Sequence, residues 1–229
     1  MKTLDARRVV PVFFVTLLVT AAVVIIDLML VDVARQHRSD AALQMFERGQ
    51  SEMRQGNTAA ALELFRSAHN QSTSNSEYHL AFARGLRANG LEREGQAAVE
   101  RLLSQLPSHG GANAEMARIL AHAGDWERAA WFYHRSLYGE WRGSPDLVSL
   151  RFELADLLAK HGADGELLAE VVLLETLSGP SLDRRHLAKL LLAAKAWTRA
   201  ERQYQMLLRS SPAEAELLAG LARAQFGAG

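Results

Sequence analysis

Cysteine is absent from this chain of 229 residues. Its absence excludes disulfide frameworks, thiolate metal sites and cysteine nucleophiles, and it leaves the redox compartment open. A charge surplus is also lacking, because 26 basic and 26 acidic residues give a formal net charge of zero. Affinity for nucleic acid depends on an excess of cations that neutralise phosphates. We therefore expect no nucleic-acid partner.

Proline and aromatic residues are scarce, with five Pro and an aromatic content of 7%. Ala and Leu are frequent, and runs of β-branched residues of the kind found in strands are few beyond the first thirty residues. This composition predicts an all-α protein.

The local signatures of catalysis are missing as well. The chain has no P-loop, no G-x-S-x-G elbow, no H-E-x-x-H and no calcium-loop pattern. His122 and His134 lie on different predicted helices, and no two histidines have the spacing that places two imidazoles on one helix face for zinc. Paired carboxylates such as Glu92 and Glu94 lie at helix starts, where they favour the helix dipole. We expect no enzyme activity, no cofactor, no metal and no small-molecule substrate.

One long apolar run stands out near the N-terminus. The segment from Val9 to Ile26 contains no charged residue, and the apolar character continues to Val31. A helix rises about 1.5 Å per residue and the hydrocarbon core is about 30 Å thick, so roughly twenty apolar residues suffice to cross it. We predict a transmembrane helix over residues 9–31, after a short cytoplasmic segment 1–8 and before a juxtamembrane linker or helix extension 32–41.

Basic residues precede this run, as they do in a cleavable signal peptide: Lys2, Arg7 and Arg8. The run is longer than the usual apolar region of such a peptide, and no A-x-A cleavage site follows Val31. We therefore favour an uncleaved signal anchor over a cleaved leader.

The orientation follows from the balance of basic residues, with Arg35 and Arg38 opposing the three that precede the run. The bias favours a cytoplasmic N-terminus. We expect a single-pass protein of a bacterial inner membrane, with its larger part in the periplasm.

Asp27 lies within the predicted span, where an ionisable residue indicates a function or a partner helix. The alternative is that Asp27 sits at the depth of the lipid headgroups with no specific role.

Three glycines repeat with a fixed period. Gly56, Gly90 and Gly124 are separated by 34 residues each, and an amphipathic helical pattern precedes and follows each of them. A period of this length is the signature of a helical repeat array.

In these segments the sequence resembles the tetratricopeptide repeat (TPR) family, whose pattern has small residues near positions 8, 20 and 27, an aromatic near 24 and often Pro near 32. The matching residues are Gly49, Ala61, Phe65 and Ala68 in a repeat over 42–75, Ala83, Gly95 and Pro107 over 76–109, and Ala117, Ala129 and Tyr133 over 110–143.

Later repeats are weaker. In a repeat over 148–180, Ala155 and Gly162 match the pattern but Leu167 stands where a small residue is expected. A repeat over 181–214 has Tyr204 in place, with Lys195 where the bend glycine would be. A terminal helix is expected over 213–226.

The resemblance implies a right-handed TPR-type solenoid of about five helix pairs plus the terminal helix, over residues 42–229. Each pair buries its apolar face against the next. Phe65, Tyr133 and Tyr204 are therefore expected in the core.

The resemblance also implies that the first helix of every repeat lines a concave groove that binds protein or peptide. The residues at the groove positions include Phe46, Gln50, Arg54, Arg84, Arg87, Arg118, His122, Asp156 and Lys160. We expect Arg84 and Arg118 to lie side by side and to fork onto carboxylates of an acidic peptide. The alternative is that these side chains merely face water.

Two further features bear on partners. Some family members grip a C-terminal carboxylate with Lys and Asn residues, but the Asn residues are missing here, so we do not expect that specificity. Trp141, in the irregular segment GEWRGSPD, is a second candidate for partner contact. It could equally pack over the junction between the third and fourth repeats.

The sequence thus predicts a membrane-tethered scaffold that binds proteins or peptides. The resemblance implies a role in the assembly of a bacterial envelope complex, because proteins of this layout are found among factors for secretion and pilus formation. The alternative is a structural or regulatory subunit of an inner-membrane complex, for polysaccharide secretion or cytochrome maturation, that acts through its transmembrane helix. Self-association stays open.

Overall fold

The computed structural model describes residues 6–179 and 181–229, and in the first helix it describes side chains only at Thr20, at 23–33 and from 36 onward. These residues form eleven helices and no strand, apart from one isolated parallel bridge between His109 and Glu140. The prediction of an all-α fold is confirmed for this part of the chain. The chain divides into two compact units, residues 1–85 and 86–229.

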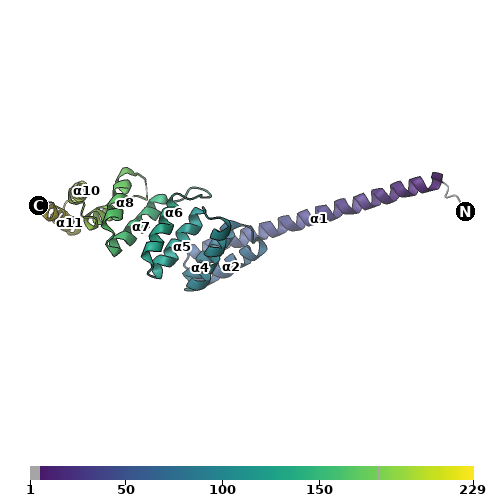
Figure 1. The fold of residues 1–229 in the computed structure, drawn as a ribbon, viewed down its shortest axis with the longest axis horizontal. Coiled ribbons are helices and arrows are strands. Elements are labelled where there is room, and N and C mark those ends of the chain that lie inside the picture. Colours follow the sequence, from purple (N-terminus) through teal and green to yellow (C-terminus); the bar gives the residue numbers. More distant parts are fainter. Residues whose placement is uncertain (1–5, 180) are drawn as a thin grey trace. The chain divides into compact units, whose positions relative to one another are not determined.

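The first unit contains helix α1 (Ala6–Arg54), helix α2 (Thr58–Gln71) and most of α3 (Ser76–Ala88). The long helix α1 packs its C-terminal part against α2 (Figure 1). Phe65 lies in a core cluster with Ala61 and Ala81, and Phe46 of α1 packs against this cluster. Close approach of α1 and α2 requires Gly49, since a Cβ there would lie 2.7 Å from the Phe65 ring.

Helix α1 runs without a break through the predicted segment 32–41 into the first helix of the repeat array. Most of the predicted span, Val9–Val31, lies outside the residues whose side chains are described. Within the described residues, no helical stretch combines the length and the apolar character that crossing a bilayer requires.

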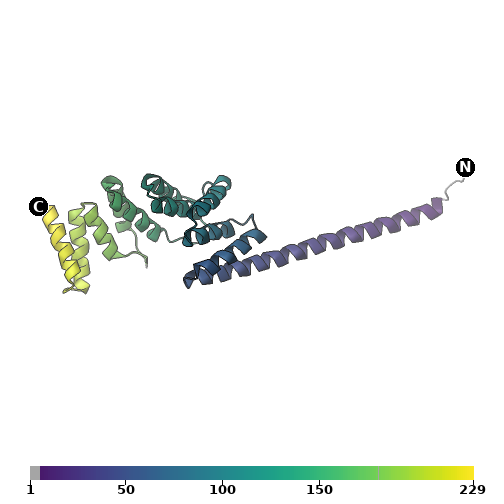
Figure 2. The same cartoon turned by 90° about the horizontal axis from the view of Figure 1, so that it is seen from below.

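The second unit begins at Leu86, near the end of α3, and contains eight further helices: α4 (Glu92–Gln105), α5 (Gly110–His122), α6 (Trp126–Leu137), α7 (Leu147–His161), α8 (Asp164–Thr176), α9 (Arg184–Ala193), α10 (Trp197–Ser210) and α11 (Ala215–Ala228). Each of these eight helices contacts the next, and α9 also contacts both α7 and α11 (Figure 2). The contacts of α9 place it beside α7 and α11, and α8 and α10 connect these three helices along the chain.

The repeating glycines occupy matching bends. Gly56, Gly90 and Gly124 have φ of +83°, +74° and +84°, in the left-handed region that an L side chain disfavours. Gly162 adopts +69°, and Lys195 adopts +57° at the place where the pattern lacks glycine. The predicted helix bends are confirmed.

The predicted aromatic core is confirmed as well. Phe65, Tyr133 and Tyr204 are each at most 4% exposed. The small residues of the pattern, such as Ala129 and Ala200, are fully buried where helices approach one another. Burial of this kind is the main stabilising contribution of a helix pair that cannot cover its own apolar face.

Candidate functional site

Several of the predicted groove residues surround one cavity in the first unit. Gln50 and Arg84 line it, together with Phe46 and Arg54 of the predicted set. The remaining lining residues are Met53, Phe65, Glu77 and Ala81. We call this space, of about 330 Å³, the N-terminal cavity.

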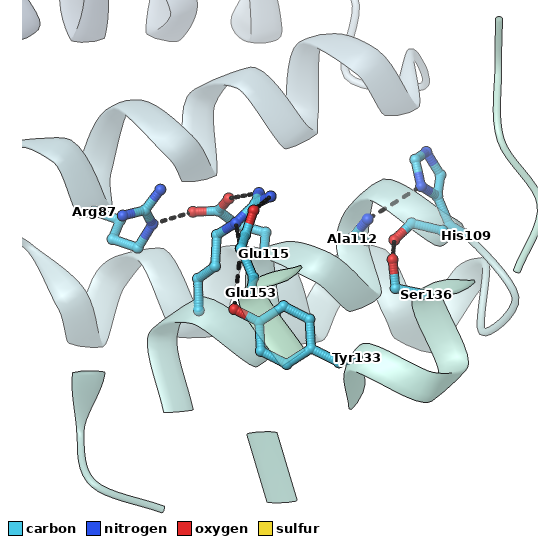
Figure 3. Close-up of polar contacts among 9 residues, drawn as sticks. Arg87, His109, Ala112, Glu115, Tyr133, Ser136 and Glu153 are labelled. Atoms are coloured by element: carbon cyan, nitrogen blue, oxygen red, sulfur yellow. Dashed lines mark hydrogen bonds and ion pairs between the residues drawn. The ribbon is translucent and has the colours of Figure 1, made fainter. Parts of the chain in front are cut away.

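The other predicted arginines take part in ion pairs within the second unit. Arg87 contacts the carboxylate of Glu115, a side chain of α5 that is 0% exposed. Arg118 lies 3.6 Å from the second oxygen of Glu115, and it donates from Nε and Nη2 to the carboxylate of Glu153 at 2.7 and 2.8 Å. Figure 3 shows Glu153 also receiving the hydroxyl of Tyr133, at 3.0 Å. These five residues form the central ion-pair network.

The charges of this network stabilise each other. Burial alone would raise the pKa of Glu153, but the hydrogen bond and charge of Arg118 outweigh it and hold that pKa below its ordinary value. Burial likewise disfavours the charged form of Arg118, yet its paired carboxylates raise its pKa. The fork that the sequence predicted between Arg118 and a peptide carboxylate is made in this structure with Glu153.

Three further predicted site residues neither line the N-terminal cavity nor belong to the central ion-pair network. His122 is exposed, with Nδ1 2.6 Å from a carboxylate oxygen of Glu92. Asp27 is exposed on α1. Trp141 is half-buried and packs on its own repeat, because its Nε1 donates to the carbonyl oxygen of Ser136 at 2.9 Å and a Cβ on Gly110 would lie 2.2 Å from that nitrogen.

A larger cavity lies in the second unit, among α9, α10 and α11. It measures about 600 Å³, and we call it the C-terminal cavity. Its lining residues are Lys189, Leu192, Ala193, Trp197, Tyr204, Glu216, Gly220, Arg223, Phe226 and Gly227. Tyr204 is 3% exposed, and Gly220 allows α11 to approach it, since a Cβ there would lie 2.3 Å from the ring.

The C-terminal cavity is lined by aromatic side chains and by more positive than negative charges. Lys189 bonds to Glu216 at 2.7 Å, and this contact raises the pKa of the Lys189 ammonium group. Within the part of the chain that the structure describes, Arg223 makes no ion pair. Phe226 is 91% exposed at the rim. The cavity can therefore take an apolar side chain next to an anionic group, which Arg223 would attract.

The C-terminal cavity was not predicted from the sequence. The fifth repeat was predicted from Ala200, Tyr204 and Pro212, with Lys195 as a departure from the pattern, and the terminal helix from its amphipathic pattern. No groove residue was predicted in either. Lys189, Leu192 and Arg223 stand at the groove positions of the fifth repeat and of the terminal helix. The period of the repeats would therefore have predicted these three lining residues.

Among the described residues, no three His, Asp or Glu side chains are grouped so that they could hold a metal ion.

No protein-family model and no curated protein matches this chain. Solved structures do. The chain is similar to Pseudomonas aeruginosa pilF, with a TM-score of 0.64 and 16% identity over 82% of this chain and 84% of that one. It is also similar to a tetratricopeptide repeat protein from Parabacteroides merdae, with a TM-score of 0.58 and 16% identity over 82% and 73% of the two chains.

A thermophilic TPR protein from Thermus thermophilus is a third similar structure, with a TM-score of 0.56 and 21% identity over 81% of this chain and 100% of that one. Sequence identities this low support a shared fold but not a shared function. The helix pairs, the bends and these similarities together show that the chain has the fold of the tetratricopeptide repeat proteins.

Proposed function

We propose that the chain is a membrane-tethered scaffold that binds protein or peptide segments through its stacked helices, in the assembly of a bacterial envelope complex. The binding part of the proposal rests on the C-terminal cavity, a largely apolar space whose lining includes Tyr204 and Arg223. Such a combination of an apolar pocket with few polar groups is typical of binding sites.

The chemistry of the cavity defines the ligand class. Trp197, Tyr204 and Leu192 provide apolar contact for a large side chain. Two cations and one carboxylate line the cavity, so a ligand with an acidic group is favoured over one with a basic group. The expected ligand is a peptide segment with a large apolar residue beside Asp or Glu.

Selection from a random peptide display library with the full chain tests this proposal. Enriched peptides are expected to pair a large apolar residue with an acidic neighbour. The Arg223→Glu variant should lose these peptides, since it places a carboxylate where the ligand carries one. The matched control is Arg202→Glu, an exposed arginine of α10 that does not line the cavity.

Equal enrichment by wild type and Arg223→Glu would place binding elsewhere. Enrichment of peptides without acidic residues would contradict the ligand class.

Exposed apolar side chains support the membrane part of the proposal. Val23 to Ile26, Leu28 to Val31 and Val33 are all exposed on α1. Apolar surface of this extent is unfavourable in water and is typical of segments that lipid or another protein covers. The predicted span Val9–Val31, with the inner membrane as its location and the array in the periplasm, thus stays our proposal.

The absence of cysteine allows a direct test of orientation. Ser210 is exposed near the end of α10, so a single Ser210→Cys variant provides one labelling site. A membrane-impermeable maleimide added to intact spheroplasts should label it if the array is periplasmic. Labelling only after lysis would reverse the orientation, and a chain that carbonate washing releases from membranes would contradict the anchor.

The subunit alternative gives the opposite pattern in a capture experiment. If deletion of residues 1–31 or Asp27→Asn abolishes association with membrane partners while Arg223→Glu has no effect, the chain acts through α1 and not through the cavity.

A further inference from the structure

The two cavities are built from the same places of the repeat array. All lining residues of the N-terminal cavity except Phe46 have a counterpart 139 residues later in the C-terminal cavity. The pairs are Gln50 and Lys189, Met53 and Leu192, Arg54 and Ala193, Phe65 and Tyr204, Glu77 and Glu216, Ala81 and Gly220, and Arg84 and Arg223. The two cavities are therefore formed by equivalent positions of the repeats.

A small residue beside the buried aromatic opens each cavity. In the first unit Ala81 lies in one cluster with Phe65, and in the second unit Gly220 lies against Tyr204. Neither residue has a side chain large enough to fill the space above the ring.

Larger side chains occupy the same place in the intervening repeats. Glu115 follows Ala81 by 34 residues, and Glu153 and His186 hold the place in α7 and α9. Glu153 covers Tyr133 by accepting its hydroxyl, and His186 contacts Asp156 at 2.6 Å. In the middle of the array the side chains at this place therefore pair with other residues of the chain.

The charges around the two cavities agree as well. Arg54, Arg84 and Glu77 line the N-terminal cavity, whereas Lys189, Arg223 and Glu216 line the C-terminal one. Each cavity thus has two cations and one carboxylate around an apolar floor. A ligand that combines an apolar side chain with an acidic group complements both.

We infer that the N-terminal cavity is a second binding site for the same class of peptide, so that one chain binds two segments. The inference rests on the proposed function. Both cavities, of about 330 Å³ and about 600 Å³, have room for one large apolar side chain.

Photo-crosslinking tests the inference on the full chain. The probe is a blocked heptapeptide, AAELEAA, with photo-leucine in place of its leucine, and mass spectrometry locates the adducts. We expect adducts in two regions, among the residues that line the N-terminal cavity and among those that line the C-terminal cavity.

Charge reversal then separates the sites. Arg54→Glu should lower N-terminal adducts about tenfold and leave C-terminal adducts unchanged, and Arg223→Glu should do the converse. Arg54→Gln, which keeps the helix end neutral, should give an intermediate loss. Arg202→Glu is the matched control and should leave both sets of adducts at the wild-type level, with circular dichroism verifying that every variant is folded.

The outcomes distinguish the two proposals. Adducts confined to the C-terminal cavity and lost in Arg223→Glu would overturn the second site while the proposed function stands. Adducts in neither cavity, or adducts that neither reversal changes, would contradict the proposed function itself.

Discussion

Lys195 holds a backbone conformation that its repeat counterparts give to glycine. Its φ is +57°, whereas Gly90 and Gly124 have +74° and +84°. The hydrogen bonds at the bends of Lys195 and Gly124 also match. In both, the next residue donates its N–H to the carbonyl oxygen five residues earlier, and the N···O distance is 2.9 Å for Ala196 as well as for Asp125. Replacing Lys195 by glycine should therefore relieve strain without changing the bend.

The magnitude follows from two opposing effects. A left-handed conformation costs an L residue about 1–2 kcal/mol. Glycine loses more backbone freedom on folding, which offsets about 0.4–1 kcal/mol of the gain. Any replacement also removes the exposed ion pair between Lys195 Nζ and Asp164, 2.5 Å apart and worth at most about 1 kcal/mol. Comparing Lys195→Gly with Lys195→Ala cancels that ion pair.

We expect Lys195→Gly to be more stable than Lys195→Ala by about 1 kcal/mol, or about 2–4 °C in Tm for a unit of this size. Urea unfolding followed by circular dichroism measures the difference. Gly124→Ala is the converse variant, since a Cβ there would contact nothing within 4 Å and only the backbone penalty remains. Equal stability of the glycine and alanine variants at position 195 would refute the assignment of this bend.

Three further predictions concern packing, pH and the Trp141 segment. Ala129→Leu should lower the free energy of unfolding by about 1–3 kcal/mol, seen in the urea midpoint, because Ala129 is fully buried between helices. Arg118 lowers the pKa of Glu153 in the folded chain, so this pair contributes fully to the free energy of unfolding above the ordinary carboxyl pKa, and the contribution is lost as pH falls through the lower folded pKa. Glu153→Gln should therefore make the free energy of unfolding depend less on pH in the acid range. Identical pH dependence of wild type and variant would contradict this prediction. Gly110→Ala should displace the Trp141 ring and shift its fluorescence, with a Trp141→Phe background as the control.

Much of the fold could be predicted from the sequence because each repeat encodes its bend and its core locally. Gly56, Gly90 and Gly124 mark left-handed bends, and Phe65 and Tyr133 mark the aromatic core. These features need only the residue type and the period, which one sequence provides.

The site could be predicted only in part. Gln50 and Arg84 were chosen by groove position, and the structure brings both to one cavity. The roles of Glu115 and Glu153 were missed, because their partners lie on other helices and ion pairing there depends on burial that no local pattern reports.

The continuity of α1 was likewise only one of two predictions for residues 32–41. No proline or glycine interrupts the chain between Pro11 and Gly49, so nothing ends the helix before the repeat array begins. Passage from a lipid to an aqueous environment, as proposed for α1, does not by itself break the backbone hydrogen bonds of a helix.

The central claim is that peptides bind at the cavities and not along the whole inner face. Hydrogen–deuterium exchange of the full chain with saturating AAELEAA peptide tests it most directly. Slower exchange is expected in α9 and α11, over Arg184–Ala193 and Ala215–Ala228, and around the N-terminal cavity at residues 50–54 and 77–84, with α5 and α7 unchanged. Protection of α5 and α7 around the central ion-pair network, with none at α11, would contradict the account.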